Sequence, residues 1–330
     1  MGPVETAGAP RGAWRRAQAG RSAPSLCSAP LARGRALSSS TVASRPAGAV
    51  VVDGLALAQE LRAELAREVA ALVAAGRRPP CLAVVLVGDD PASASYIKGK
   101  RRACERVGMA SLEHKLAADS REGDVLACVD KLNRDDGSDG ILVQLPLPEG
   151  VSANAVASAI DPAKDVDGVG PLNAGRLLMG DVGLFPCTPL GILEILDRHE
   201  VALDGAHAVV IGRSMIVGKP VSLLLQRRNA TVTMCHSRTR DLPALCRSAD
   251  VLVSAVGMPR LVKADWIRPG AAVIDVGVTE LDGELVGDVD FEAAQGVAGL
   301  ITPHRRGVGP MTITMLLRNT LLAYRQRAGS

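Results

Sequence analysis

Short runs of mostly apolar, often β-branched residues alternate with helix-forming segments in the second half of the chain. The runs are "HAVVIG" (207–212), "ATVTMCHS" (230–237), "VLVSAVG" (251–257) and "AAVIDVGV" (271–278). Segments with helical character, 219–229 and 242–250, separate the first three runs. Strands that alternate with helices in this way form a parallel sheet, so residues 187–307 are predicted to form a Rossmann-type domain.

The first half has a related pattern. Apolar periodicity predicts a helix over 55–75, and "CLAVVLVG" (81–88) is predicted to be a buried strand. Helices are then expected within 89–109 and 121–135, followed by a strand in "GILVQLPLP" (140–148). This β-α-α-β progression predicts a second parallel sheet, with 140–148 as its central strand.

Two further helices connect these regions. In "PCTPLGILEILDRH", Thr188 is a good N-cap and Pro189 suits the first helical position, so a bridging helix is expected there. A long C-terminal helix is predicted over 309–327. We therefore predict an α/β fold of two domains around a cleft, one of residues 48–186 plus 308–330 and the other of residues 187–307.

Composition narrows the class of protein. Apolar residues make up 47% of the chain but aromatic residues only 2%, so the cores must consist mainly of Ala, Val, Leu and Ile. No run of eighteen apolar residues occurs, so no membrane helix is predicted. The seven cysteines are scattered without a C-x-x-C motif, and no H-E-x-x-H is present, which argues against a disulfide framework and against a metal site. We expect neither a nucleic acid nor a membrane as a partner.

The first 47 residues differ from the rest in charge. They contain seven arginines, no lysine and one acid, Glu5, for a net charge of +6. The other 31 basic and 34 acidic residues give the remainder a net charge of −3. An Arg-rich, Ser-rich and acid-poor leader is typical of an organelle transit peptide and predicts a mitochondrial location. The alternative is a disordered leader without an address, and a cytoplasmic protein.

A candidate cofactor site follows the strand at 207–212. The loop "GRSMIVGKP" offers Gly212, Arg213, Ser214 and Gly218 between a strand and a helix whose N-terminal amides can bind an anion. A NAD site usually has an acidic residue at the end of the next strand, but here that strand ends in "CHSR". Arg213 and Ser237 would instead bind a 2′-phosphate, which predicts NADP. The alternative is an α/β domain with an unused crevice.

Three motifs in the first half have candidate catalytic residues. Tyr96 and Lys100 in "SYIKGK" are four residues apart, so they would share one helix face, either as a catalytic pair or as part of a solvated basic face. Gln144 lies among branched apolar residues near a strand's carboxyl end, as a ligand contact or as an amide bonded to nearby backbone. Asp165 and Asp167 in "KDVDG" are either turn formers or acceptors for an amino-heterocycle.

Together these motifs carry a resemblance. "SYIKGK", "GILVQLPLP", "PAKDVDGVGPLNAGRL", "PCTP", "VVIGRSMIVGKP", "ATVTMCHSRT", "GAAVIDVGV", "VGDVDF" and "GVGPMT" occur in family order over roughly residues 50 to 325. The chain thus resembles the bifunctional methylenetetrahydrofolate dehydrogenase/cyclohydrolase family. The resemblance implies oxidation of 5,10-methylenetetrahydrofolate to the methenyl form with NADP, then hydrolysis to 10-formyltetrahydrofolate. It also implies a folate-binding catalytic domain and a homodimer.

The resemblance also assigns roles. Lys100 would move protons in the hydrolytic step, and Gln144 would orient Lys100 and the water. Tyr96 would pack on the folate, Asp167 would bind the pterin, and Pro310 would contact the substrate. Lys98, Arg101 and Arg102 are expected to be solvated rather than catalytic. Asn229 and Ser237 match the NADP-type members of the family and not the NAD-dependent type, which leaves a NAD-preferring variant as the alternative.

One loop departs from the family pattern. The family has T-P-V-P-G-G-V-G-P-M-T where this chain reads "TPHRRGVGPMT", so that His304, Arg305 and Arg306 replace Val, Pro and Gly. Loss of the glycine costs backbone freedom wherever φ is positive. The arginines would either block the folate and nicotinamide site or repel the positive charge of the nicotinamide, or they would point outward and contact the glutamate tail of the folate. The alternatives to the bifunctional enzyme are therefore an inactive relative that binds folate or a partner, and an unrelated dehydrogenase of the amino-acid or shikimate type.

Overall fold

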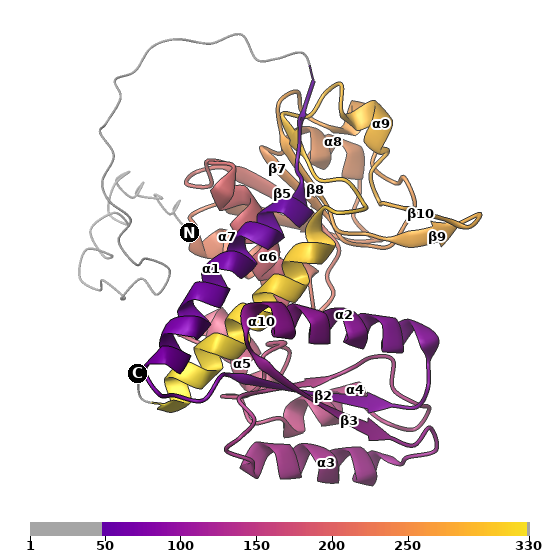
Figure 1. The fold of residues 1–330 in the computed structure, drawn as a ribbon. Helices are drawn as coiled ribbons and strands as arrows, with labels where there is room; N and C mark the ends of the chain where they lie inside the picture. The colour runs from indigo at the N-terminus through magenta and orange to yellow at the C-terminus, as the bar shows by residue number, and fades with distance from the viewer. Residues whose placement is uncertain (1–47, 329–330) are drawn as a thin grey trace, which may run out of the picture. The chain divides into compact units, whose positions relative to one another are not determined.

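The computed structural model describes residues 48–328, apart from the side chains of residues 91–96. Residues 1–47, and with them the predicted leader and Cys27, lie outside the described part. Two parallel sheets organise the fold (Figure 1). One has three strands in the order β3-β2-β4, and the other has six in the order β1-β11-β8-β7-β5-β6. This confirms the α/β fold.

The three-stranded sheet is built from β2 (Cys81–Val87), β3 (Ala110–Leu116) and β4 (Gly140–Val143). Its helices are α2 (Pro91–Val107), α3 (Glu122–Arg134), α4 (Ala153–Ala159) and α5 (Pro171–Met179). Successive residues of β2 point to opposite faces, so Val84 packs in the same core as α2, and Val85 packs with α3. Figure 1 shows α2 and α3 on opposite sides of this sheet.

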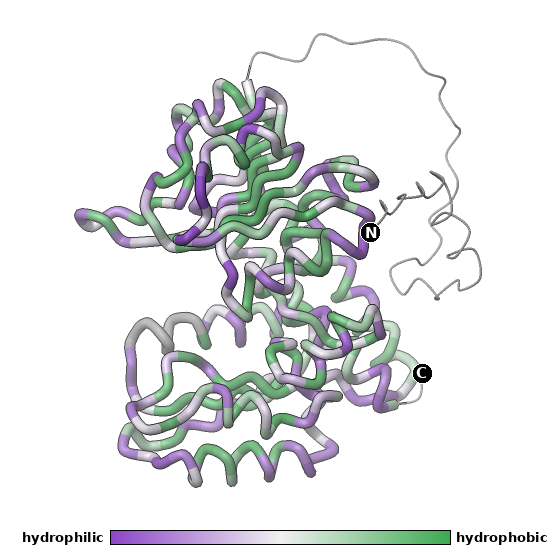
Figure 2. Tube along the Cα trace, turned by 180° about the vertical axis from the view of Figure 1, so that it is seen from behind, coloured by the Kyte–Doolittle hydropathy of each residue, from purple (hydrophilic) through white to green (hydrophobic). Residues whose placement is uncertain are grey.

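The six-stranded sheet contains the strands of the nucleotide-binding pattern. They are β1 (Val50–Val51), β5 (His207–Ile211), β6 (Thr231–Cys235), β7 (Val251–Ser254), β8 (Ala272–Asp275) and β11 (Leu300–Ile301). The accompanying elements are α7 (Gly218–Arg227), α8 (Leu242–Arg247), a 3-10 turn (Ala264–Trp266), α9 (Phe291–Ala294) and the hairpin of β9 (Thr279–Leu281) and β10 (Glu284–Val286). The first strand, β1, pairs with β11 although it is far from it in sequence. Figure 2 shows that the strands form the hydrophobic centre of this region.

Three helices join the two sheets. They are α1 (Gly54–Ala74), α6 (Cys187–Arg198) and α10 (Val308–Ala328). Helix α10 runs beside α1 and also contacts α6 (Figure 1). Leu61, Ile195 and Met315, one from each helix, belong to one apolar cluster that also includes residues of both sheets. The two domains therefore share a core.

Three local predictions were wrong. The strand β3 was missed because "ASLEHKL" is an edge strand with largely polar, partly exposed residues. Strand β4 is not central, since it lies at the edge and β2 occupies the middle. Thr188 is not an N-cap: α6 begins at Cys187 after Pro186, and the Thr188 hydroxyl instead lies 3.0 Å from the Thr312 hydroxyl of α10.

Candidate active site

A lysine and a glutamine meet at the carboxyl end of β4. The Lys100 amine, from α2, donates a 2.8 Å hydrogen bond to Oε1 of Gln144. Gln144 directly follows β4, and its backbone N–H donates to the Val85 carbonyl of β2 at 2.9 Å. This hydrogen bond fixes the position of Gln144 relative to β2. Its Nε2 donates to the Leu145 carbonyl at 2.6 Å. The amide therefore satisfies nearby backbone with its nitrogen and holds Lys100 with its oxygen.

Two opposing effects act on the pKa of the Lys100 amine. Burial lowers the pKa of the Lys100 amine, whereas the nearby Asp167 carboxylate raises it to a lesser extent. Burial in turn raises the pKa of Asp167, and Lys100 partly reverses that increase. Each group thus makes the charged form of the other less costly, and the net effect leaves Lys100 easier to deprotonate than a free lysine.

Asp165 and Asp167 have different surroundings. Asp165 is 1% exposed, and its carboxylate shapes the loop as a turn former does. The donors to Asp165 are the backbone N–H groups of Gly168, Val169 and Gly170 and the side-chain amide of Asn173. Asp167 interacts with Lys100 instead, so only Asp165 acts as the turn former that the motif allowed, and a ligand contact of Asp167 stays a prediction.

The sequence analysis missed two residues beside Asp167. The buried Cys187 thiol donates to the Val166 carbonyl at 3.3 Å and also hydrogen-bonds Asp167, and burial raises its pKa well above the ordinary value. Asn319 of α10 donates from Nδ2 to the carbonyls of Val166 (2.8 Å) and Phe185 (2.9 Å). Only the presence of Cys187 in the "PCTP" motif could have indicated it, and no sequence signal pointed to Asn319.

Tyr96 lies on α2 one helical turn before Lys100. The i, i+4 spacing on a continuous helix places both residues on one face, as the sequence predicted. Among their basic neighbours, Lys98, Arg101 and Arg102 are exposed, and Arg101 approaches Glu105 at 3.5 Å. These three cations thus belong to a solvated face.

The candidate cofactor loop begins where β5 ends. Gly212 has a φ of +119°, and a Cβ atom at this position would lie 2.4 Å from the Ala255 carbonyl oxygen, so only glycine fits. Ile211 of β5 pairs with Cys235 of β6. Arg213 and Ser237 each lie two residues after this pair, so they follow their strands at the same edge of the sheet. Both side chains are exposed and form no hydrogen bond or ion pair with the rest of residues 48–328. They are available to a ligand at the same edge of the sheet.

The N-terminus of α7 differs from the expected anion site. The Ser214 hydroxyl accepts from the backbone N–H groups of Val217 (3.1 Å) and Gly218 (3.3 Å), and the Ser214 carbonyl accepts from Lys219 (3.0 Å). Pro220 follows and has no N–H. The amides of the first turn are therefore engaged within the chain in this structure, and their binding of an anion stays a prediction.

The departure loop, residues 302–307, where the chain departs from the family pattern, turns toward α1. Arg306 has a φ of +64°, which is the conformation that the family glycine adopts without strain. Its guanidinium pairs with Asp53, the N-cap of α1, at 3.0 Å. Pro310 lies in the first turn of α10, where its carbonyl accepts a 2.9 Å hydrogen bond from Arg62. The Arg306 side chain is thus engaged at the start of α1.

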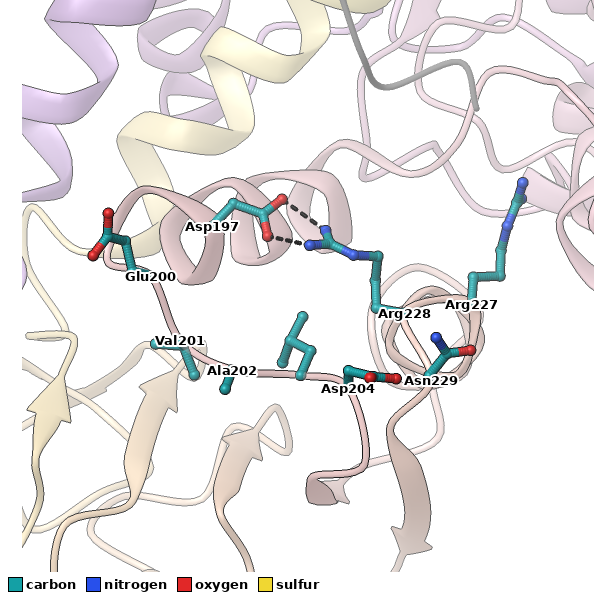
Figure 3. A pocket seen from close by; sticks show the side chains of 9 residues that line it. Asp197, Glu200, Val201, Ala202, Asp204, Arg227, Arg228 and Asn229 are labelled. Atoms are coloured by element: carbon teal, nitrogen blue, oxygen red, sulfur yellow. Dashed lines mark hydrogen bonds and ion pairs between the residues drawn. The ribbon is translucent and has the colours of Figure 1, made fainter. Parts of the chain in front are cut away.

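Two cavities formed by described residues lie elsewhere. One, of about 460 Å³, lies where α6 and α7 end, beside the ion pair between Asp197 and Arg228 (Figure 3). The other, of about 700 Å³, lies at the amino ends of the six-stranded sheet, near Val50, Ala272 and Leu300. Ligands of open α/β sheets bind at the carboxyl ends, so neither cavity is the expected site.

Residues 48–328 contain no group of three or more His, Cys, Asp or Glu side chains arranged to hold a metal ion. The six cysteines in this part of the chain are free thiols. None of the described helices combines the length and hydropathy needed to cross a membrane.

The fold and the loop at Gly212 define a two-domain α/β protein with a Rossmann-type NAD(P)-binding domain. Residues 52–167 match the family model of the tetrahydrofolate dehydrogenase/cyclohydrolase catalytic domain, and residues 186–328 match that of its NAD(P)-binding domain. The chain therefore belongs to the tetrahydrofolate dehydrogenase/cyclohydrolase family.

Relatives agree with this assignment. The chain is 56% identical over 280 residues to the bifunctional protein FolD 2 of Frankia alni, covering 85% of this chain and 97% of the relative. It is 55% identical to FolD of Sphingopyxis alaskensis, covering 84% and 95%. A Trypanosoma brucei methylenetetrahydrofolate dehydrogenase-cyclohydrolase, solved with NADP cofactor and an inhibitor, has a TM-score of 0.81 at 39% identity and covers 86% of this chain and 99% of that one.

Proposed function

We propose that this chain oxidises 5,10-methylenetetrahydrofolate to the methenyl form with NADP⁺ and then hydrolyses that product to 10-formyltetrahydrofolate. The observation that carries the proposal is the hydrogen bond from Lys100 to Gln144 beside Asp167. The bifunctional relatives and both family domains support it. The Arg306 side chain does not oppose it, because it is paired with Asp53.

Hydrolysis requires a group that can accept a proton. Water adds to the cationic methenyl carbon and loses one proton, which gives a carbinolamine. The C–N bond to one folate nitrogen then breaks as that nitrogen takes up a proton. The hydroxyl group loses the second proton of the water and becomes the formyl C=O, so one proton is released overall. A neutral Lys100 amine accepts the proton from water and returns it to the leaving nitrogen. Burial lowers the pKa of Lys100, which increases its neutral fraction, and Gln144 holds the amine in place. Asp167 binds the pterin, while Tyr96 and Pro310 pack against the substrate.

The residues of the second domain fit NADP. Gly212 leaves room for close backbone approach, Ser214 and Gly218 shape the loop, and Arg213 and Ser237 offer an unpaired guanidinium and hydroxyl to a 2′-phosphate. No acidic residue follows Cys235 to favour the ribose diol of NAD. Bound NADP⁺ supplies the hydride acceptor. The chain contributes binding and orientation to that step.

The assay uses the full chain, 5,10-methylenetetrahydrofolate and either NADP⁺ or NAD⁺, and follows the reduced cofactor and the methenyl compound together. We expect faster reduction of NADP⁺ and little accumulation of methenyl compound. Absence of turnover with both cofactors, from protein with the far-UV circular dichroism of a folded α/β chain, would contradict the proposal. Faster reduction of NAD⁺ would contradict the cofactor assignment alone.

We also propose that residues 1–47 direct the protein to mitochondria. Their net charge of +6, to which arginine is the only basic residue that contributes, supports this proposal. A reporter fused to residues 1–47 is expected to enter mitochondria, and a cytosolic reporter would contradict the proposal. We further propose that the protein is a homodimer whose catalytic domain comprises 48–186 plus 308–330, although Val50–Val51 pair with β11 in the sheet of the other domain. Sedimentation equilibrium of the full chain tests the dimer, and a monomer mass would exclude it.

A further inference from the structure

Two buried aspartates lie outside the residues assigned above. Asp275 is the last residue of β8 and Asp288 follows β10, and their exposed fractions are 2% and 1%. They come from "VIDVGV" and "VGDVDF", two family motifs to which the sequence analysis gave no function. Neither carboxylate forms an ion pair within the described part of the chain, so backbone donors dominate their environment.

Asp288 binds the end of β7 and the loop that follows it. Its Oδ2 accepts from the Val256 N–H at 2.8 Å and from the Ser254 hydroxyl at 3.1 Å. Its Oδ1 accepts from the Met258 N–H at 2.8 Å. Hydrogen bonds to a carboxylate are stronger than those between neutral groups, so one side chain fixes the course of residues 254–258.

Asp288 is itself held in place. Asp275 accepts the backbone N–H of Asp288 at Oδ1 and that of Val289 at Oδ2, both at 3.0 Å. The Asp275 N–H donates to the Thr302 hydroxyl at 2.8 Å, at the start of the departure loop. Burial, only partly offset by these backbone donors, raises the pKa of Asp275 to about 7. The two aspartates, through their carboxylates and the Asp275 backbone, therefore connect the ends of β7, β8 and β11.

The loop after β7 lies at the point where the sheet order reverses. From β5 the chain goes to β6 on one side and then returns to β7 on the other. Dinucleotides bind in the crevice outside the carboxyl ends of such strands. The Ala255 carbonyl approaches Gly212 so closely that a Cβ there would lie 2.4 Å away. If Arg213 and Ser237 bind the 2′-phosphate on the β6 side, as proposed, a dinucleotide that crosses the reversal would place its other half against residues 255–258.

We infer that Asp288 is a positioning residue for the dehydrogenase reaction, which sets the loop 255–258 against the nicotinamide half of NADP, and that Asp275 holds Asp288 in this role. The inference rests on the proposed function, because that function supplies the hydride acceptor. Asp288 acts through the backbone of the loop and not by contact with the reacting atoms.

The test is Asp288→Asn. Asparagine has one acceptor oxygen, whereas the N–H groups of Val256 and Met258 need acceptors on different oxygens, so one of them would face the amide NH₂. A misplacement of about 1 Å costs roughly 100-fold in rate, so we expect kcat for dehydrogenation to fall by about that factor. Hydrolysis of methenyltetrahydrofolate without cofactor is expected to be unchanged, because Lys100 and Gln144 lie in the other domain.

The control is Asp250→Asn. Asp250 also accepts a backbone N–H, that of His207 at 2.9 Å, but at the amino end of the same sheet. We expect both activities to be unchanged in this variant. Ser254→Ala is a smaller change at the same site, because it removes one hydroxyl donor and leaves both backbone donors on Asp288. We expect dehydrogenation to fall less in Ser254→Ala than in Asp288→Asn.

A binding measurement separates the two halves of the cofactor. Adenosine 2′,5′-bisphosphate carries the 2′-phosphate but no nicotinamide, so Asp288→Asn should leave its Kd unchanged while weakening NADP⁺. Undiminished dehydrogenation in Asp288→Asn, equal loss of both activities, or equal weakening of both ligands would overturn the inference. If the unmodified protein has no turnover, the proposed function fails, and the comparison of the two ligands still decides the inference.

Discussion

The Lys100 cluster and the Gly212 loop arrange polar side chains in opposite ways. In the first domain, Lys100 and Gln144 are partly buried and hydrogen-bonded to each other, and Asp167 and Lys100 shift each other's pKa. In the second domain, Arg213 and Ser237 are exposed and unpaired within the described part of the chain. Catalysis by proton transfer needs a perturbed pKa, and burial provides it. Recognition of a phosphate needs a fully charged group without a competing partner, and exposure provides that.

The largest expected effect is on hydrolysis. Lys100→Met removes the proton acceptor, and general acid–base catalysis contributes about 10²- to 10⁴-fold, so hydrolysis should fall by a factor in this range. Dehydrogenation should survive in part, because it depends mainly on positioning. Loss of methenyl absorbance measures hydrolysis. Lys98→Met, an exposed neighbour on α2, is the matched control, and full hydrolysis in Lys100→Met would refute the assigned role.

The second effect is on cofactor choice. Arg213→Ala combined with Ser237→Asp removes one cation and places an acid beside the 2′-phosphate. A hydrogen bond to a charged group is worth about 1.5–3 kcal/mol, so NADP⁺ should bind roughly 10- to 100-fold more weakly. NAD⁺ should bind about as before. Isothermal titration of both cofactors measures the ratio, with Arg240→Ala as the surface control, and an unchanged preference would exclude these residues as the 2′-phosphate site.

The third effect tests the coupling between charges. Hydrolysis should decline as pH falls and Lys100 becomes protonated. The Asp167 carboxylate raises the pKa of Lys100, so Asp167→Asn should lower that pKa and move the acidic limb to lower pH. The measurement is the pH profile of kcat at saturating substrate, and a limb that stays in place or moves to higher pH would contradict the coupling.

The smallest expected effect is at the departure loop. Arg306→Gly relieves a positive φ, which stabilises the chain, but it also removes the exposed pair with Asp53, which solvent screens, so the two small effects oppose each other. Stability and both activities should therefore change little. Thermal unfolding and the two assays check this. A large gain of activity in Arg306→Gly would show that the arginine obstructs the site.

The sequence alone determined the features that depend on local patterns. The continuous apolar run of β2 and the helical periodicity of α1 were enough to predict these elements, because a short apolar run suits a strand buried on both faces and a 3.6-residue period suits a helix. The motifs also identified the family, since many long segments in order leave little freedom. The edge strand β3 was not predicted, because it is partly exposed and its polar residues do not form the apolar pattern of a buried strand.

Only the tertiary structure decided which distant residues meet. Lys100 and Gln144 are 44 residues apart, and they touch because β4 pairs with β2 in one register. The Ser214 hydroxyl occupies amides that a sequence pattern leaves open. Asp288 reaches Met258 across the sheet, 30 residues away. Such contacts depend on strand order and packing, which the chain acquires only when the whole core forms, so no local pattern specifies them.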